Sequence, residues 1–218
     1  MAGVESMSMH RPIQWALVVL SFGSGATDAF AFLALGGVFT ANMTGNLVLV
    51  GLVGRPDYVQ TLIASVAAVL AFLAALYLGF RVTRSGPSRL LPLLVGVGVV
   101  QAVVLGIWWS AGTGPHVSLD ALMIVLSAVA MGWHTVLGRR LSARAGVSTT
   151  FVTGTLTALM LDLSEGRHEV HSLRLAAIGA LVVGSFAGAL LLLAAPGVGP
   201  VLPVVAVVVA LLLMRRAA

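Results

Sequence analysis

Long apolar runs dominate this sequence, and they limit the folds that are open to it. Six of the runs are long enough for a membrane-spanning helix, which needs about 17 to 25 residues, whereas two contain about fifteen residues each. Hydrophobic residues make up 59% of the 218 residues and charged residues only 9%, far below the roughly 25% of soluble domains. We therefore predict an all-α integral membrane protein. The eight runs are Ile13–Leu35, Thr40–Gly54, Val59–Phe80, Leu90–Ser110, Val117–Gly138, Thr149–Leu163, Ser172–Ala194 and Val198–Met214.

The twelve basic residues, all of them arginines, indicate how the two short runs lie. If all eight runs cross the membrane, six arginines fall on each side. If the short runs instead enter the membrane and return to the side they came from, every arginine except Arg55 falls on the side of the chain ends. Arginine-rich loops are cytoplasmic in membrane proteins. We therefore predict six transmembrane helices and two short re-entrant half-helices in the cell inner (plasma) membrane, with residues 1–12 and 215–218 in the cytoplasm.

An internal repeat organises this single membrane domain of residues 1–218. In the first half, residues 25–28 (Gly-Ala-Thr-Asp) precede residues 44–47 (Thr-Gly-Asn-Leu) by about twenty positions. In the second half, residues 132–135 (Gly-Trp-His-Thr) precede residues 153–156 (Thr-Gly-Thr-Leu) in the same way. Because each half crosses the membrane three times, the second half starts on the opposite side. The sequence predicts an inverted-topology repeat of residues 13–110 and 117–214, an arrangement found in many transporters.

Polar residues gather at the starts of both short segments. Helix starts carry free N–H groups and a partial positive charge, so two starts that meet near the midplane suit an anion or another small polar solute. The alternative is that small polar residues only pack helices together, which is the role expected for Gly184 and Gly188. The candidate solute-binding residues in the short segments are Thr40, Asn42, Thr44, Gly45 and Asn46, with Thr149, Thr150, Thr153, Gly154 and Thr155.

Two ionisable residues stand inside long apolar runs. Asp28 lies about 22 Å along an ideal helix that starts at Ile13, and an acidic residue at such a depth is a functional-site hypothesis by default. The alternative for Asp28 is a protonated carboxyl, or a brace that accepts hydrogen bonds from the backbone of the short segment. His134 is a candidate proton relay together with Asp28, and the alternative is an interfacial residue beside Trp133.

Other functional classes find little support in the sequence. The arginines are too scattered for a nucleic-acid surface, and we expect no nucleic-acid partner. Residues 168–171 (His-Glu-Val-His) do not match a zinc motif, and we expect no metal site and no cofactor. No acid, base and nucleophile converge at one depth, so we do not expect an enzyme with catalytic residues.

The sequence also resembles a known family. Residues 25–47 (Gly-Ala-Thr-Asp-Ala to Met-Thr-Gly-Asn-Leu) and residues 149–157 resemble the YoaK-like family of small bacterial multi-pass membrane proteins. The resemblance covers nearly the whole chain, and it implies a fold of membrane helices with signatures at Asp28-Ala29 and at residues 43–46. In the second half, residues 133–135 (Trp-His-Thr) depart from the amide-rich stretch that relatives often carry. The family supplies an architecture and no substrate.

These observations lead to one functional hypothesis and one rival. The hypothesis is a transporter or channel for a small polar or anionic solute, with its site at the starts of the half-helices and with Asp28 as the coupling or gating residue. The rival is a non-transporting membrane scaffold or an accessory subunit. The lipid bilayer is the partner expected in both cases, and a homodimer is compatible with a bundle of six helices.

Overall fold

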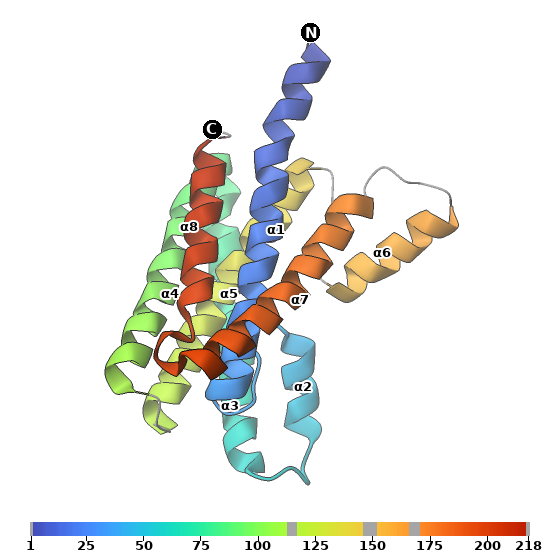
Figure 1. The fold of residues 1–218 in the computed structure, drawn as a ribbon. Coiled ribbons are helices and arrows are strands. Elements are labelled where there is room, and N and C mark those ends of the chain that lie inside the picture. The colour runs from blue at the N-terminus through green and yellow to red at the C-terminus, as the bar shows by residue number, and fades with distance from the viewer. Residues whose placement is uncertain (1, 113–116, 146–151, 166–170, 217–218) are drawn as a thin grey trace.

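The computed structural model describes residues 2–112, 117–145, 152–165 and 171–216, and these residues form helices joined by short connections, without a β-strand (Figure 1). Six α-helices are long and two are short. The long helices are α1 (Ala2–Ala34), α3 (Tyr58–Val82), α4 (Leu90–Ala111), α5 (Val117–Ala145), α7 (His171–Ala194) and α8 (Val201–Arg215), and the short ones are α2 (Met43–Gly51) and α6 (Val152–Ser164). Single 3-10 turns cover η1 (Thr83–Ser85), η2 (Pro87–Arg89) and η3 (Pro196–Val198).

The six long helices correspond to the six long apolar runs. Each contributes to a segment of at least 20 residues that is long and apolar enough to cross a membrane. α1 begins and α8 ends at the same end of the bundle (Figure 1). The predicted all-α membrane architecture with six candidate spans is therefore confirmed.

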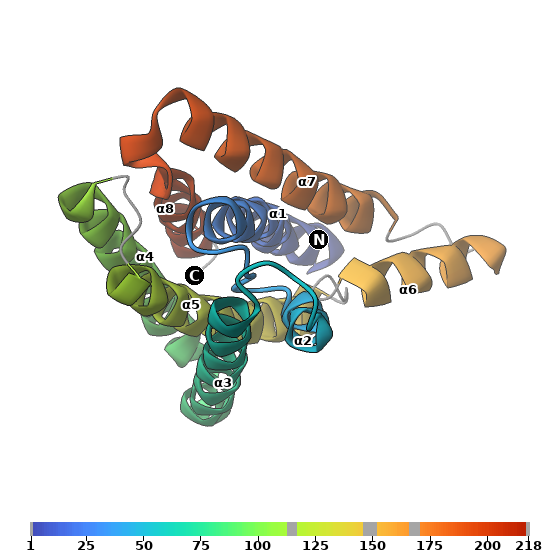
Figure 2. The same cartoon turned by 90° about the horizontal axis from the view of Figure 1, so that it is seen from below.

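The two short helices fall where the two short runs were predicted, and neither is long enough to cross a bilayer. With a rise of 1.5 Å per residue, the nine residues of α2 extend about 14 Å and the thirteen of α6 about 20 Å, against a hydrocarbon core of about 30 Å. α2 packs along α3, whereas α6 contacts α7 and projects away from the rest of the bundle (Figures 1 and 2).

α1 and α5 form the centre of the bundle. They are the most buried of the six candidate spans, and α7 is the least buried. They are also the two least apolar spans, since they carry the hydroxyls, Asp28 and His134. Helices at the periphery must face lipid, which explains why α3 and α7 expose large side chains such as Leu70, Tyr77 and Phe186.

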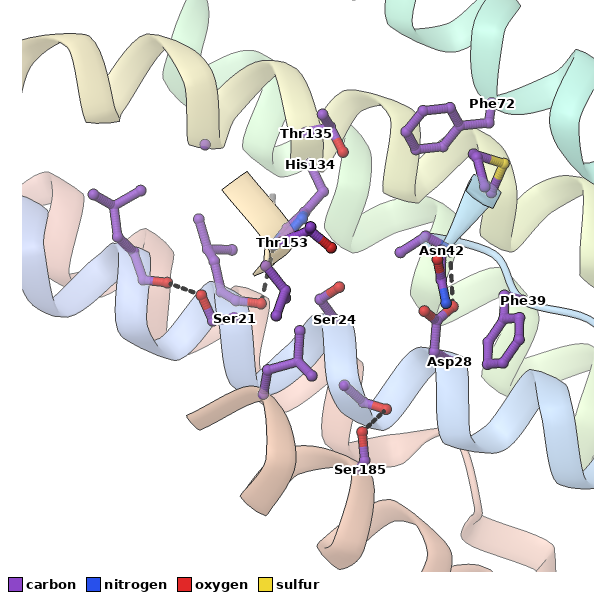
Figure 3. Close-up of a pocket in the computed structure, with 18 residues that line it drawn as sticks. Ser21, Ser24, Asp28, Phe39, Asn42, Phe72, His134, Thr135, Thr153 and Ser185 are labelled. Atoms are coloured by element: carbon purple, nitrogen blue, oxygen red, sulfur yellow. Dashed lines mark hydrogen bonds between the residues drawn. The ribbon is translucent and has the colours of Figure 1, made fainter. Parts of the chain in front are cut away.

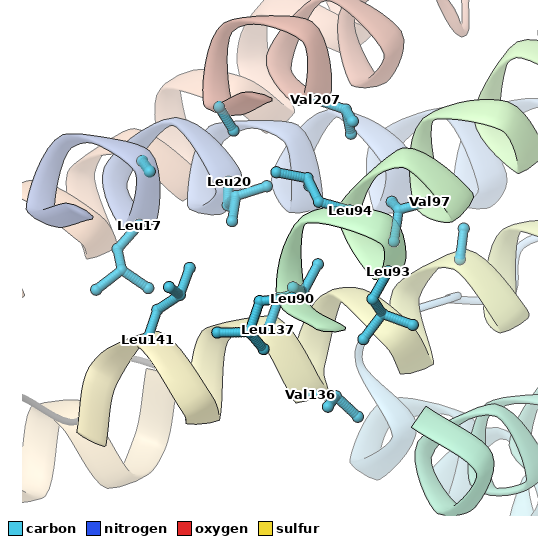
Figure 4. Packing of buried hydrophobic residues seen from close by; sticks show 13 residues of the cluster. Leu17, Leu20, Leu90, Leu93, Leu94, Val97, Val136, Leu137, Leu141 and Val207 are labelled. Carbon is cyan, nitrogen blue, oxygen red and sulfur yellow. The ribbon is translucent and has the colours of Figure 1, made fainter. Parts of the chain in front are cut away.

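Two apolar clusters hold the bundle together. One joins the middle of α1 and the first turns of α4 to the second half of α5 and the middle of α8, and it includes Leu17, Leu94 and Leu137 (Figure 4). The other lies toward the opposite end of α1, where the Phe30 ring meets the edge of Trp108 at a centroid distance of 5.0 Å. The Trp108 indole Nε1 donates to the Pro196 carbonyl at 2.7 Å, so the buried polar end of this ring has a partner.

α1 and α7 cross with their backbones in direct contact. A Cβ atom on Gly25 would overlap the Leu181 carbonyl, and a Cβ atom on Gly184 would overlap the Phe22 carbonyl. Gly188 likewise lies against the Ala26 backbone. The helix-contact role predicted for Gly184 and Gly188 is therefore confirmed, because only residues without a side chain allow so close an approach.

Candidate functional site

A cavity of about 530 Å³ lies beside the middle of α1, enclosed by α1, the start of α2, α3, α5, α6 and α7. Its volume is within the range of small-molecule sites, about 300–1,000 Å³. Apolar side chains such as Leu20, Phe72 and Leu181 form much of the wall. The polar residues of the described wall, most of them visible in Figure 3, are Ser21, Ser24, Asp28, Asn42, His134, Thr135, Thr153 and Ser185.

Asp28 ties α1 to the segment that leads into α2. Its Oδ1 accepts three hydrogen bonds, from the Thr40 backbone N–H at 2.7 Å, the Thr40 hydroxyl at 3.1 Å and the Ala41 backbone N–H at 2.8 Å. The two backbone N–H groups lie in the irregular segment between α1 and α2, where no helical hydrogen bond is available to them. The carboxylate therefore gives a partner to groups that would be costly to bury unpaired. The structure therefore supports the brace interpretation, and the same residue also lines the cavity.

Asn46 fixes the same segment from its other side. Its Oδ1 accepts from the Phe39 backbone N–H at 2.8 Å, and its Nδ2 donates to the Phe39 carbonyl at 2.6 Å. The Asn46 side chain has no exposed surface. Asn42 caps α2, with Oδ1 accepting from the Gly45 N–H at 3.2 Å. The start of α2 and the segment before it are thus held by the side chains of Asn42, Asn46 and, from α1, Asp28.

His134 reaches from α5 to α1. Its Nε2 lies 3.0 Å from the Leu20 carbonyl oxygen. A carbonyl oxygen can only accept, so Nε2 carries the hydrogen, and Nδ1 of the neutral ring is then an acceptor. His134 and Asp28 line the same cavity at different levels of α1, because Leu20 precedes Asp28 by about 12 Å of ideal helix.

The structure brings only part of the predicted site together. Asp28, Asn42, His134 and Thr153 line the cavity, with Asn42 just before α2 and Thr153 in the first turn of α6. Thr40 and Asn46 instead hold the loop before α2, and their polar groups are engaged within the protein. The remaining candidates do not line the described wall: Thr44 and Gly154 are exposed, Gly45 packs against Phe39, Thr155 is buried, and Thr149 and Thr150 lie outside the described residues.

Four hydroxyl residues of the wall were not predicted. Ser21 and Ser24 lie seven and four residues before Asp28, a spacing that places all three on one face of α1. Thr135 follows His134, and Ser185 lies next to Gly184 at the crossing with α1. The helical spacing of Ser21 and Ser24 from Asp28 could have been used to predict that these two serines share its face of α1. The positions of Thr135 and Ser185 depend on how distant helices pack.

A second cavity, of about 590 Å³, lies where α3 and α5 begin. Its wall is mostly apolar, with Asp57, Gln60 and Asp120 among its polar residues. Its described wall includes no residue of α2, α6 or α7, so neither short helix contributes to it. Within the described part of the chain, no cluster of histidine and acidic side chains could hold a metal ion.

Comparison with known proteins places the chain in a family. Residues 16–214 match the family model described as Protein of unknown function (DUF1275). The chain belongs to this family. It is also similar to UPF0700 transmembrane protein YoaK of Bacillus subtilis (strain 168), with 31% identity over 149 residues, which cover 68% of this chain and 66% of that protein. No solved structure matches the chain.

These matches confirm the predicted YoaK-like resemblance. The relative is named as a transmembrane protein, and this chain has six apolar helices of spanning length. This member of the DUF1275 family is therefore a multi-pass membrane protein.

Proposed function

We propose that this protein is a transporter or channel that moves a small polar solute through the cavity beside α1. One observation carries the proposal: six polar side chains from α1, α5, α6 and α7, together with Asp28 and Asn42, line one cavity inside an otherwise apolar bundle. Polar groups are expensive at membrane depth and are retained there mainly for hydration, binding or transport. Glycines make the closest backbone contacts at the helix crossings, and among the wall hydroxyls Ser185 bonds to another helix whereas Ser21 and Thr135 bond within their own, so packing alone does not account for the polar wall.

The pairing of helices supports an inverted repeat. α1 packs on α7 and α8, and its predicted counterpart α5 packs on α3 and α4 in the corresponding way. At the first crossing Gly25 meets the α7 backbone, and at the second Gly132 meets the α3 backbone at Phe72. Residues 25 and 132 are the same position of the sequence repeat. We therefore propose that residues 13–110 and 117–214 are inverted halves, and that α2 and α6 are re-entrant.

The arginines give the proposed orientation. Arg81, Arg84, Arg89 and Arg215 lie at the ends of α3 and α8 and in the turns before α4, and so share a side with the chain ends in the six-span arrangement. By the positive-inside rule that side is the cytoplasm, and we propose the inner membrane as the location. The exception, Arg55, has a structural role, because its Nη1 donates to the Gly37 carbonyl at 3.5 Å after the end of α1.

Asp28 gives the proposed site a way to couple binding to movement. Its carboxylate belongs to the cavity wall and also holds the Thr40 and Ala41 backbone before α2. A solute that engages this carboxylate competes for the charge that stabilises the loop. Binding in the cavity and the position of α2 are then linked through one residue. His134, at another level of the cavity, is the proposed partner of Asp28 in a proton relay.

The cavity can be tested with introduced thiols, because the chain contains no cysteine. Ser24→Cys and Thr135→Cys place thiols on the wall from α1 and α5, and Ser88→Cys places a control thiol on the exposed turn η2. Purified variants in proteoliposomes are assayed for uptake of a panel of small neutral, cationic and anionic solutes. A bulky charged methanethiosulfonate should abolish uptake in the two cavity variants and leave the Ser88→Cys variant active.

The same assay separates the proposal from its rival. If no solute of the panel enters faster than into protein-free vesicles, the transport proposal fails and the scaffold or accessory-subunit hypothesis takes its place. If uptake occurs but the thiol reagent blocks neither cavity variant, the pathway lies elsewhere.

A further inference from the structure

We propose that the solute of this cavity is a small cation rich in N–H donors, of the ammonium or guanidinium type, and not an anion. This inference rests on the proposed transport function and names its substrate class. The preference for a cation follows from the hydrogen bonds within the cavity wall. These bonds determine whether the wall can still donate to a ligand or only accept from one.

The N–H groups before α2, which suit an anion in principle, are engaged within the protein. The Thr40 and Ala41 N–H groups donate to Asp28, and the Phe39 N–H donates to Asn46. Within the first turn, the Gly45 N–H is capped by Asn42. The chain supplies its own carboxylate to this helix start, so an incoming anion would have to displace Asp28 and would meet its negative charge.

Three of the five hydroxyls on the described wall donate their hydrogens to backbone carbonyls in the same way. Ser21 donates to the Leu17 carbonyl at 3.0 Å, and Thr135 donates to the Met131 carbonyl at 2.9 Å. Ser185 donates to the Gly25 carbonyl across the helix crossing at 3.1 Å. A hydroxyl has one hydrogen and two lone pairs, so each of these groups has only acceptor capacity left for a ligand.

The ionisable groups of the wall point to the same ligand class. The carboxyl of Asp28 accepts hydrogen bonds from Thr40 and Ala41 through Oδ1, and the backbone N–H of Asn42 also donates to it. The Nε2 of His134 donates its hydrogen to the Leu20 carbonyl, so the other nitrogen of the neutral ring, Nδ1, can only accept a hydrogen bond. The described lining contains no arginine or lysine. A carboxylate without a basic neighbour, in surroundings of low dielectric constant, attracts a cation and repels an anion.

Three planar probes of matched size test the proposal. Guanidinium is permanently charged and offers only donors, urea has a similar shape without charge, and nitrate is an anion that offers only acceptors. Uptake into wild-type proteoliposomes is measured with potassium and valinomycin present, so that charge movement does not limit the rate. We expect guanidinium to enter at least about tenfold faster than nitrate, since a hydrogen bond to a charged partner is worth roughly a tenfold change or more in binding.

An Asp28→Asn variant separates charge from bracing. The Asn side chain keeps an oxygen that can accept from Thr40 and Ala41, whereas the negative charge is lost. Guanidinium uptake should fall by about tenfold or more, and urea uptake should fall less, because urea does not depend on the charge. If this variant does not elute as a folded monodisperse protein, protection of the Ser24→Cys thiol in the otherwise wild-type chain decides: guanidinium should slow its modification and nitrate should not.

The outcomes distinguish this inference from the function on which it rests. If nitrate enters faster than guanidinium, or if nitrate alone protects the thiol at position 24, the cation proposal is overturned while transport stands. If none of the probes and no solute of the wider panel enters, the transport proposal fails and the cation proposal fails with it.

Discussion

Replacement of Asn46 by alanine should destabilise the protein by about 2–4 kcal/mol. The change removes two hydrogen bonds to the Phe39 backbone, and such bonds are worth about 0.5–1.5 kcal/mol each in soluble proteins and about 0.6 kcal/mol on average between membrane helices. It also leaves the Phe39 N–H and carbonyl without these partners, at about 1 kcal/mol or more each. Asn46 is fully buried, so water cannot easily replace the lost amide.

Thermal unfolding of purified protein in one detergent measures the effect. A loss of about 2–4 kcal/mol corresponds to a Tm lower by about 4–16 °C for a chain of this size. Thr44→Ala is the matched control, since Thr44 lies on the same helix and is exposed, and its Tm should stay close to that of the wild type. Asn46→Leu fills the space without hydrogen bonds and should remain destabilised. An Asn46→Ala protein that unfolds within about 0.5 kcal/mol of wild type, the range of ordinary surface changes, would refute the assignment of Asn46 as a brace.

Three further predictions test the packing and the orientation. Gly184→Leu should lower the stability of the fold by at least about 1–3 kcal/mol, or abolish the folded peak in size-exclusion chromatography, because the new side chain would overlap the Phe22 backbone. Gly179→Leu is the control, since this site on α7 has open space, and the variant should elute normally. Trp108→Phe keeps a ring beside Phe30 but loses the bond to the Pro196 carbonyl, so the Tm should fall by an amount equivalent to about 1 kcal/mol, whereas Trp109→Phe on the exposed surface should change it little. In whole cells an impermeant maleimide should label Arg55→Cys from outside and Arg84→Cys only after lysis, and labelling of the latter in intact cells would contradict the proposed orientation.

Much of the fold could be predicted because the membrane imposes few solutions. Apolar length identified the six long helices, and the short length of the other two runs separated α2 and α6. Helix ends were less accessible. α1 begins at Ala2, well before the predicted start at Ile13, and α5 continues past Gly138 to Ala145. Helical hydrogen bonding extends beyond the apolar segment, so hydropathy marks the part that suits lipid and not the full helix.

The candidate site was only partly predictable. Asp28 was singled out because a carboxyl among apolar residues is costly, and the structure gives it both a brace contact and a place on the cavity wall. His134 was singled out with Asp28, and both line the cavity, which extends along α1 from Leu17 to Asp28. Thr135 and Ser185 could not be found in this way, because a hydroxyl in a membrane helix is common and only the packing of α5 and α7 against α1 brings these two to the cavity.

The bond between Asp28 and Thr40 also has a consequence for how the protein is made. Asp28 is only twelve residues from Thr40 and thirteen from Ala41, so these residues leave the ribosome almost together. The carboxylate can therefore be paired before the distant helices have packed against α1. The contact of Ser185 with Gly25 spans 160 residues and must wait for α7. The pairing of Asp28 is thus a local contact, whereas the wall of the cavity beside α1 is complete only once α7 has packed against α1.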